Sequence, residues 1–183
     1  GFDFAVQAQM WKVKGIRYQG CTFQNLRTTE NQSSKRGQGI RSLDAEFHVT
    51  SRCADLGPPP PPGFCHNVIP SKFINLDHGI HANTASNLMT FTVEESEFTN
   101  NVAGVYVRGV NAFQVQHSSF SVGGSHATIL DNPEEWSWLS ANRGTYSYQS
   151  QGFVLQHNTA QHSPTTPVGV KPEGFVTGWT GGS

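Results

Sequence analysis

The chain has 183 residues and a formal net charge of −1, a length typical of one domain and a charge that excludes nucleic-acid binding through bulk positive charge. Charged residues make up only 14% of the chain, against about 25% in ordinary soluble domains, while its 12 phenylalanines supply apolar surface for a core. No apolar run approaches the roughly 20 residues of a membrane span. The first ten residues lack the basic and apolar regions of a signal peptide.

An apolar–polar alternation recurs along the chain, and its copies align without gaps over eight positions. Position three is apolar or aromatic, position six is small, and position eight is Phe in four of the five strongest copies. This period-two pattern predicts short strands. The strongest copies are IRYQGCTF (16–23), HNVIPSKF (66–73), FTVEESEF (91–98), FQVQHSSF (113–120) and FVLQHNTA (153–160), with a weaker one, FHVTSRCA, at 47–54.

The copies at 16–23, 66–73 and 91–98 are each followed by a polar turn and then by a second short strand. Asn25, Asn75 and Asn100 stand two positions beyond the copies, and a Gly with an aliphatic residue opens the next strand at 39–40, 79–80 and 104–105. Uninterrupted copies begin at residues 66, 91 and 113, a spacing of about 22–25 residues that is typical of one coil of a parallel β-solenoid. Stacked coils place like positions over one another, which predicts an internal Phe stack and a ladder of Asn amides.

The segments SKFINLDHGI and SEFTNNVAGV share the pattern S-x-F-x-N-x-x-x-G-[IV]. This pattern resembles the right-handed parallel β-helix repeats of the pectate-lyase-like superfamily, which are abundant in large secreted and surface proteins of bacteria, notably the Bacteroidota with their type IX secretion. The resemblance covers roughly residues 12–170 and implies an all-β, right-handed parallel β-helix of about six or seven coils. It implies no activity, because this fold carries lyases, hydrolases, adhesins and phage tailspikes.

Three insertions, at 27–38, 53–65 and 131–151, interrupt an otherwise single domain over residues 1–183, and insertions in solenoids form external loops. The second holds five consecutive prolines between Cys53 and Cys65. We expect these cysteines to form a disulfide, which implies an oxidising compartment; two free thiols are the alternative. Cys21 occupies the small position six and is expected to be free and buried.

Arg41, His81 and Tyr106 each follow a Gly-aliphatic pair, with Thr128 assigned to the next coil, and are expected to point outward. A polysaccharide lyase could use them, since Arg would neutralise a uronate and His or Tyr would move protons. An ordinary solvent-facing ladder is the alternative interpretation.

Other polar groups give weaker signals. No paired carboxylates of the kind that glycoside hydrolysis needs occupy stacked positions; Glu94, Glu95 and Glu97 are assigned to one strand, and Lys72 with Glu97 to a surface ion pair. We expect no metal site and no cofactor; calcium is the alternative, and two groups of side chains are weak candidates for binding a metal ion. These groups are Asp77, His78 and His81, and His117, His157 and Glu95.

The third insertion contains the aromatic residues that most resemble a sugar-binding platform, next to two acids. The alternative is that its tryptophans pack the loop onto the solenoid. The candidate ligand-binding residues are Glu134, Glu135, Trp136, Trp138, Tyr146 and Tyr148.

Together these patterns predict a non-catalytic β-helix segment of a longer extracellular or bacterial cell-surface protein. It would act as a structural stalk, an adhesin or a glycan-binding surface, with a polysaccharide or cell-surface glycan and the rest of its own chain as partners. The alternative is a polysaccharide lyase or glycoside hydrolase acting on an acidic polysaccharide. Neither nucleic acid nor a membrane span is expected.

Overall fold

The computed structural model describes residues 6–26, 36–54, 65, 67–84, 89–122, 143–148, 150, 152, 154–157, 159–162 and 173–177. All regular structure in these residues is β-strand, in three parallel sheets and one antiparallel pair. Sheet A consists of β1 (Val6–Trp11), β4 (Gln38–Leu43), β9 (His78–Asn83), β12 (Ala103–Arg108), β15 (Arg143–Tyr148) and β18 (Glu173–Thr177). Sheet B consists of β2 (Ile16–Gln19), β5 (Phe47–Thr50), β10 (Phe91–Glu94), β13 (Gln114–Gln116) and β16 (Val154–Gln156). Sheet C consists of β3 (Thr22–Gln24), β8 (Ser71–Ile74), β11 (Ser96–Thr99), β14 (Ser119–Val122) and β17 (Thr159–His162).

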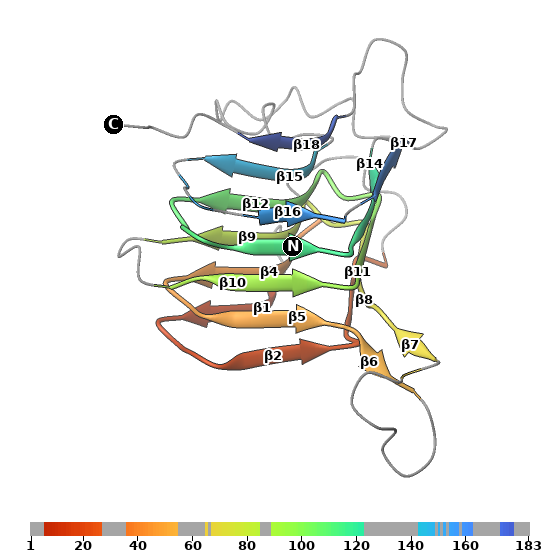
Figure 1. The fold of residues 1–183 in the computed structure, drawn as a ribbon, viewed down its shortest axis with the longest axis horizontal. Coiled ribbons are helices and arrows are strands. Elements are labelled where there is room, and N and C mark those ends of the chain that lie inside the picture. Colours follow the sequence, from red (N-terminus) through yellow and green to blue (C-terminus); the bar gives the residue numbers. More distant parts are fainter. Residues whose placement is uncertain are drawn as a thin grey trace.

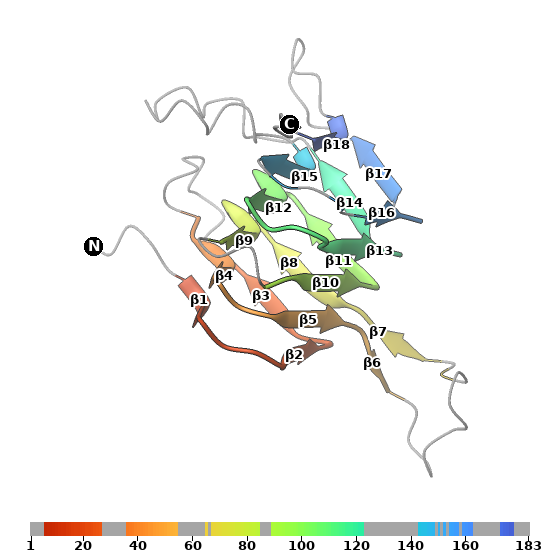
Figure 2. The same ribbon diagram turned by 60° about the vertical axis from the view of Figure 1, so that its left-hand side comes forward.

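The chain visits sheets A, B and C in the same order again and again, and each visit adds one strand to each sheet (Figures 1 and 2). We call one such passage a rung. Among the described residues, β1 to β17 complete five rungs, and β18 adds one more strand to sheet A. The prediction of an all-β chain built from parallel strands is therefore confirmed. The described residues include no helix that is long and apolar enough to cross a membrane.

The copies at 16–23, 91–98, 113–120 and 153–160 each form two strands, because the backbone turns at position five. Glu95, His117 and His157 occupy this position with φ values of 48°, 48° and 51°, the left-handed conformation that reverses a strand's direction in one residue. Positions one to four therefore lie in sheet B and positions six to eight in sheet C. The assignment of Glu94 and Glu97 to one strand is wrong, since they lie in β10 and β11.

The second rung is assembled from two of the sequence copies. The copy at 47–54 provides β5 of sheet B, and the copy at 66–73 provides the start of β8 in sheet C. Between them, β6 (Arg52–Cys53) and β7 (Val68–Ile69) form the antiparallel pair, and the expected disulfide joins Cys53 to Cys65. The chain thus makes one rung where the sequence suggested two, because the cystine-closed insertion falls at a corner between sheets B and C.

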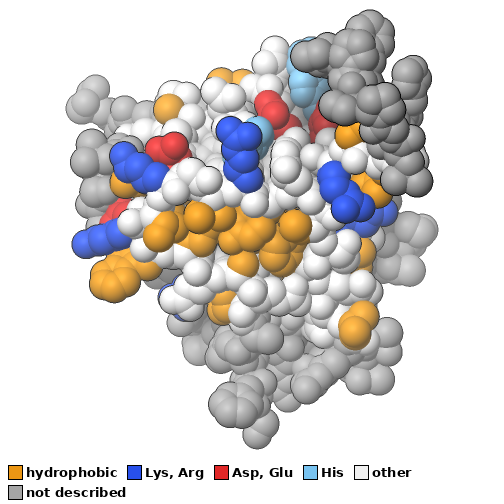
Figure 3. All heavy atoms as spheres, turned by 90° about the horizontal axis from the view of Figure 1, so that it is seen from below, with side chains coloured by type: hydrophobic (Ala, Val, Ile, Leu, Met, Phe, Trp, Pro, Cys, Tyr) orange, Lys and Arg blue, Asp and Glu red, His pale blue; other side chains and the backbone are white. Residues whose placement is uncertain are grey.

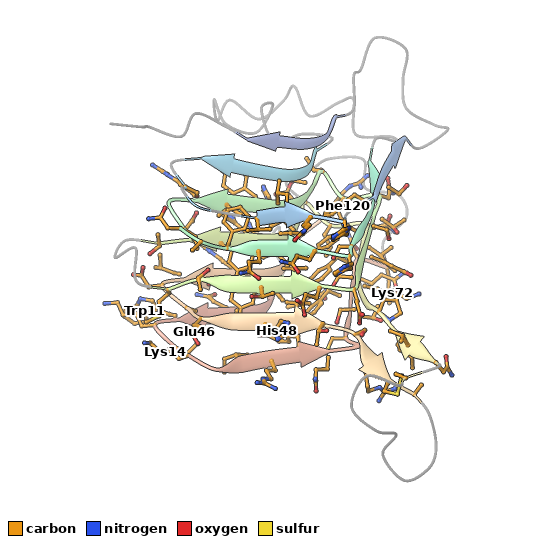
Figure 4. All side chains as sticks on the ribbon, in the orientation of Figure 1. Trp11, Lys14, Glu46, His48, Lys72 and Phe120 are labelled. Carbon is orange, nitrogen blue, oxygen red and sulfur yellow. A yellow bond between two sulfur atoms is a disulfide. The ribbon has the colours of Figure 1, made fainter. Side chains whose placement is uncertain are left out.

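Two columns of stacked phenylalanines fill the space between the sheets. Phe98 is 2% exposed, and its ring centroid lies 4.7 Å from Phe73 and 4.6 Å from Phe120, with nearly parallel planes. Phe23 continues this column 4.9 Å beyond Phe73. Figure 4 shows Phe120 inside the stack, whereas Lys72 points away from it. The column predicted from position eight is present, and Phe47, Phe91 and Phe113 form a second one.

The small residues at position six form hydrogen bonds between rungs. Ser118 Oγ donates to the carbonyl of Gln116 and accepts the N–H of Ser96 in the rung before it. Ser71 accepts the N–H of Cys21 in the same way, at 3.2 Å. The buried serine hydroxyl therefore keeps its hydrogen bonds, because it pairs with two backbone groups at once.

Asparagines follow sheet C in two adjacent positions. Asn100 Nδ2 donates to Asn75 Oδ1 at 2.6 Å, which gives the amide ladder expected at this turn. The buried Asn101 accepts the N–H of Leu76 and donates to the carbonyl of Phe73, both at 2.9 Å. Its side chain therefore takes the place of backbone partners that this turn lacks.

Two expectations differ from the structure near the ends of the stack. Cys21 is free but half-buried rather than buried, because it belongs to the first rung, which no described strand covers on its outer side. Residues 143–148, expected within the third insertion, form β15 of sheet A. Tyr146, rather than Thr128, is therefore in register with Tyr106; Thr128 lies outside the described residues.

Candidate functional site on the outward face of sheet A

Arg41, His81 and Tyr106 lie next to one another on three consecutive strands of sheet A. Arg41 pairs in register with His81, and His81 with Tyr106. Gln9 precedes them in β1, and the backbone of Tyr146 follows in β15. The inward neighbours Ile40, Ile80 and Val105 are fully buried, so the alternation of the strands turns this column outward. We call the outward positions Gln9, Arg41, His81, Tyr106 and Tyr146 the Arg41 column.

The rings at the centre of the column form a compact aromatic group. The His81 and Tyr106 centroids are 4.9 Å apart with nearly perpendicular planes. His78, at the start of β9, lies 5.0 Å from His81 and 5.2 Å from Tyr106. Tyr106 is only 9% exposed, whereas Arg41 is exposed. The face therefore combines an accessible cation with a packed aromatic floor.

His81 is held in its neutral form. Burial, then the charges of His78 and Arg41, lower its pKa from 6.5 to about 3, although Asp77 and a hydrogen bond to Asn83 act in the opposite direction. Asn83 Nδ2 lies 3.2 Å from His81 Nε2, so Nε2 accepts and the ring proton belongs on Nδ1. At neutral pH this imidazole is therefore uncharged, and its buried Nδ1 has no hydrogen-bond partner among the described residues.

A charged group lies at the sheet C side of the column. Asp77 Oδ2 is 3.0 Å from His78 Nδ1, an ion-pair distance without hydrogen-bond geometry. Arg36 is 5% exposed, and its Nη1 donates to the carbonyl of Asn100 at 3.1 Å. Burial lowers the pKa of Arg36, and the Asp77 carboxylate acts against this shift. Sequence reasoning missed Arg36, because a basic residue in a polar insertion has no pattern that distinguishes it from a solvated one.

A second outward column runs beside the first, two residues further along each strand. Leu43 pairs with Trp11 and with Asn83, and Asn83 pairs with Arg108. Trp11 is 63% and Leu43 42% exposed, and Lys12 Nζ lies 5.4 Å from the centre of the Trp11 ring. This part of the face therefore offers apolar surface next to cations.

The remaining candidates are separate from this face. The expected surface ion pair between Lys72 and Glu97 is present, at 3.1 Å. His117 and His157 stack at 5.1 Å, as their shared position five implied. Among the residues that the structure describes, no group of three or more His, Cys, Asp or Glu side chains could hold a metal ion.

The expected sugar platform is described only in part. Tyr146 and Tyr148 lie in β15, with backbones in register with Tyr106 and Arg108. The other members of the platform, Glu134, Glu135, Trp136 and Trp138, lie outside the described residues. In β4, β9 and β12 a glycine is followed by a β-branched residue, and Gly144 with Thr145 repeats this pair in β15. This signal could have placed β15 in sheet A.

Comparison of the chain with protein-family models, with curated proteins and with solved structures finds no match. The properties of the outward face of sheet A therefore rest on its own geometry.

Proposed function

We propose that this chain is a right-handed parallel β-helix segment of an extracellular or cell-surface bacterial protein, serving as a stalk or adhesin with a glycan-binding surface on sheet A. The Arg41 column is the observation that carries the binding role. The right hand is supported by the parallel crossovers, since about 98% of such connections in proteins are right-handed. The Cys53–Cys65 disulfide supports an oxidising, extracellular location.

The chemistry of the column favours binding over catalysis. The exposed guanidinium of Arg41 suits a bidentate contact with a carboxylate or sulfate, and the exposed Trp11 ring of the second outward column suits the apolar face of a sugar ring. A general base works best with a pKa near the working pH. Because the pKa of His81 is about 3, its imidazole is a weak proton acceptor at neutral pH.

The alternative is a polysaccharide lyase or glycoside hydrolase that acts on an acidic polysaccharide at the same face. The observation in its favour is the placement of Arg41, His81 and Tyr106 on consecutive strands, with the two rings 4.9 Å apart. In that case Arg41 would neutralise the uronate, and His81 or Tyr106 would transfer the proton.

One set of measurements separates the two. The chain is titrated with pectin, alginate, chondroitin and a neutral glucan, and unsaturated products and reducing ends are followed with and without calcium. We expect binding of an acidic polysaccharide without turnover, weakened about three- to tenfold, or up to about 1.4 kcal/mol, by Arg41→Ala. Lys72→Ala removes an exposed cation from sheet C and should leave binding unchanged.

Turnover that disappears in His81→Ala or Tyr106→Phe would establish the enzymatic alternative. If none of the polysaccharides binds, or if Lys72→Ala weakens binding as much as Arg41→Ala, the glycan-binding role of sheet A is refuted.

A further inference from the structure

The first rung leaves one end of the stack open. β1, β2 and β3 are the terminal strands of sheets A, B and C, so each has one edge that no described strand pairs. Figure 3 views this end and shows a band of hydrophobic side chains across it, with basic side chains along its rim. An open edge on three sheets at once is a surface on which further strands can pair.

Comparison with the second rung shows how much of this end is uncovered. Phe47, Val49 and Ser71 are 3%, 0% and 0% exposed, whereas their counterparts in the first rung, Ile16, Tyr18 and Cys21, are only half-buried. The Phe23 ring stacks on Phe73, and its other face meets no described ring of the column. The inward positions of the first rung therefore have the chemistry of a rung interface, with one side unfilled.

Cys21 shows what would lie against it. In the rungs above, Ser71 and Ser118 each accept the N–H of the position-six residue in the rung before. Cys21 holds the same position, and its Sγ already lies 3.7 Å from the carbonyl of Gln19, as each serine hydroxyl lies near the matching carbonyl in its own rung. By analogy with Ser71 and Ser118, one more rung would direct the N–H of its own position-six residue at the Cys21 sulfur.

Charge indicates which polypeptide fits this end. Residues 6–26 contain Lys12, Lys14 and Arg17 and no acidic residue. Glu46 of the second rung is an acid close to this edge: its N–H bonds to the carbonyl of Val13, and Figure 4 draws it beside Lys14. Two copies meeting through this end would oppose six cations, which disfavours self-association.

We propose that the open end is the docking surface for one more parallel rung of polypeptide, apolar at its inward positions and acidic at its outward ones. This inference rests on the β-helix proposed above and is independent of the glycan-binding role of sheet A. The partner would place an apolar residue over each of Ile16, Tyr18 and Phe23, and carboxylates near Lys12, Lys14 and Arg17.

The chain itself supplies a segment with this chemistry. Residues 91–102, FTVEESEFTNNV, form β10 and β11 with inward Phe91, Val93 and Phe98. Their glutamates hold positions four, five and seven, so Glu94 comes nearest to Arg17 at position two, and the segment places no acid opposite Lys12 or Lys14. In sheet A, Val6, Gln38, His78 and Ala103 share one register position. Replacing residues 1–5 with a copy of 91–102 therefore joins its last residue to Val6 through the connection that precedes Ala103.

The free thiol of Cys21 reports whether the end is covered. In this fusion we expect Cys21 to react with a thiol reagent at least about tenfold more slowly in the native state, because covered groups react only through local opening. Tm should rise by about 5 °C, and the amides of β2 and β3 should exchange more slowly. A matched fusion with Phe91, Val93 and Phe98 of the added copy changed to Ser should show none of these effects. Changing its three glutamates to Lys should reduce the gain at 20 mM salt, because it replaces the carboxylate nearest Arg17 with a like charge.

Three outcomes would overturn the proposal. If neither the fusion nor its glutamate-to-lysine version protects Cys21, the end is not a rung interface. If the unmodified chain is dimeric at 20 mM salt with Cys21 protected, the occupant is a second copy. If vesicles of phosphatidylserine and phosphatidylcholine protect Cys21 while the fusion does not, the end binds an anionic lipid surface instead.

Discussion

Truncating Phe98 to Ala tests the stacked core directly. The ring is 2% exposed and lies between two parallel rings at 4.7 and 4.6 Å. Phe-to-Ala changes in cores cost about 3–5 kcal/mol, and each lost aromatic pair is worth about 0.5–1.5 kcal/mol beyond area burial. We therefore expect Phe98→Ala to lower the free energy of unfolding by an amount in the upper part of the about 3–5 kcal/mol range.

The measurement is denaturant unfolding followed by circular dichroism, with a thermal scan beside it. For a chain of this length, about 2–4 °C of Tm per kcal/mol predicts a fall of roughly 6–20 °C. The denaturant slope m should not change, since the surface exposed on unfolding stays nearly the same. A change in m would indicate that rungs unfold separately.

Phe23→Ala is the matched control. Phe23 lies in the same column but has a stacked ring, Phe73, on one face only, and it is 7% exposed. Its truncation should cost less than that of Phe98, because Phe23 loses one stacked ring and the edge-on ring of Tyr18, 5.6 Å away, rather than two stacked rings, and its site at the end of the column is less enclosed. Equal costs, or a cost below about 1 kcal/mol for Phe98→Ala, would refute the argument that the column is a continuous core.

Three further predictions concern single positions. Thiol counting under denaturing, non-reducing conditions should find one free thiol, that of Cys21; a count of three would contradict the disulfide and remove the support for the proposed extracellular location. Gly79→Ala should cost about 1–3 kcal/mol, because a Cβ there would lie 2.6 Å from a carbonyl oxygen of the next strand. The control Gly15→Ala, in open space at φ +72°, should cost only about 1 kcal/mol of backbone strain, and an equal loss would count against close packing at Gly79. For His81 the folded pKa is about 3, below the unfolded 6.5, so the unfolded state binds more protons between these values. Stability should be full above pH 6.5 and fall by up to about 1.4 kcal/mol per pH unit below it; unfolding curves from pH 4 to 7 that keep this slope in His81→Gln would show that another group causes it.

The repeat predicted the core better than it predicted the backbone. Position eight identified the Phe column because stacking requires the same large residue in each rung. Position five is occupied by Gly20, Glu95, His117 and His157, all with positive φ, and only the first of these residue types signals such a turn. The corner persists because its backbone bonds the next rung, as in His117 N–H to the carbonyl of Gln156 at 3.1 Å. No single position in the sequence carries that signal.

The candidate site was predictable in its members and not in its electrostatics. Counting outward from the Gly-aliphatic pairs placed Arg41, His81 and Tyr106 on one face, because parallel strands in register repeat the same orientation. The neutral state of His81 depends first on burial, then on the charges of His78 in the same strand and of Arg41 in β4, and the sequence does not show how deeply one outward position is buried. The same limitation hid Arg36, whose partner Asn100 is 64 residues away in the chain.

The contrast between inward and outward positions indicates where selection for function can act in this architecture. Inward positions must match the rung above and the rung below, so Phe, Ser and small aliphatic residues recur there. The Arg41 column obeys no such constraint, and it presents four different side chains, Gln, Arg, His and Tyr, on an almost invariant backbone. A surface whose spacing is fixed by hydrogen bonds at about 4.8 Å while its chemistry varies suits a ligand that is itself a repeating chain. Burying His81 in its neutral form costs stability at low pH.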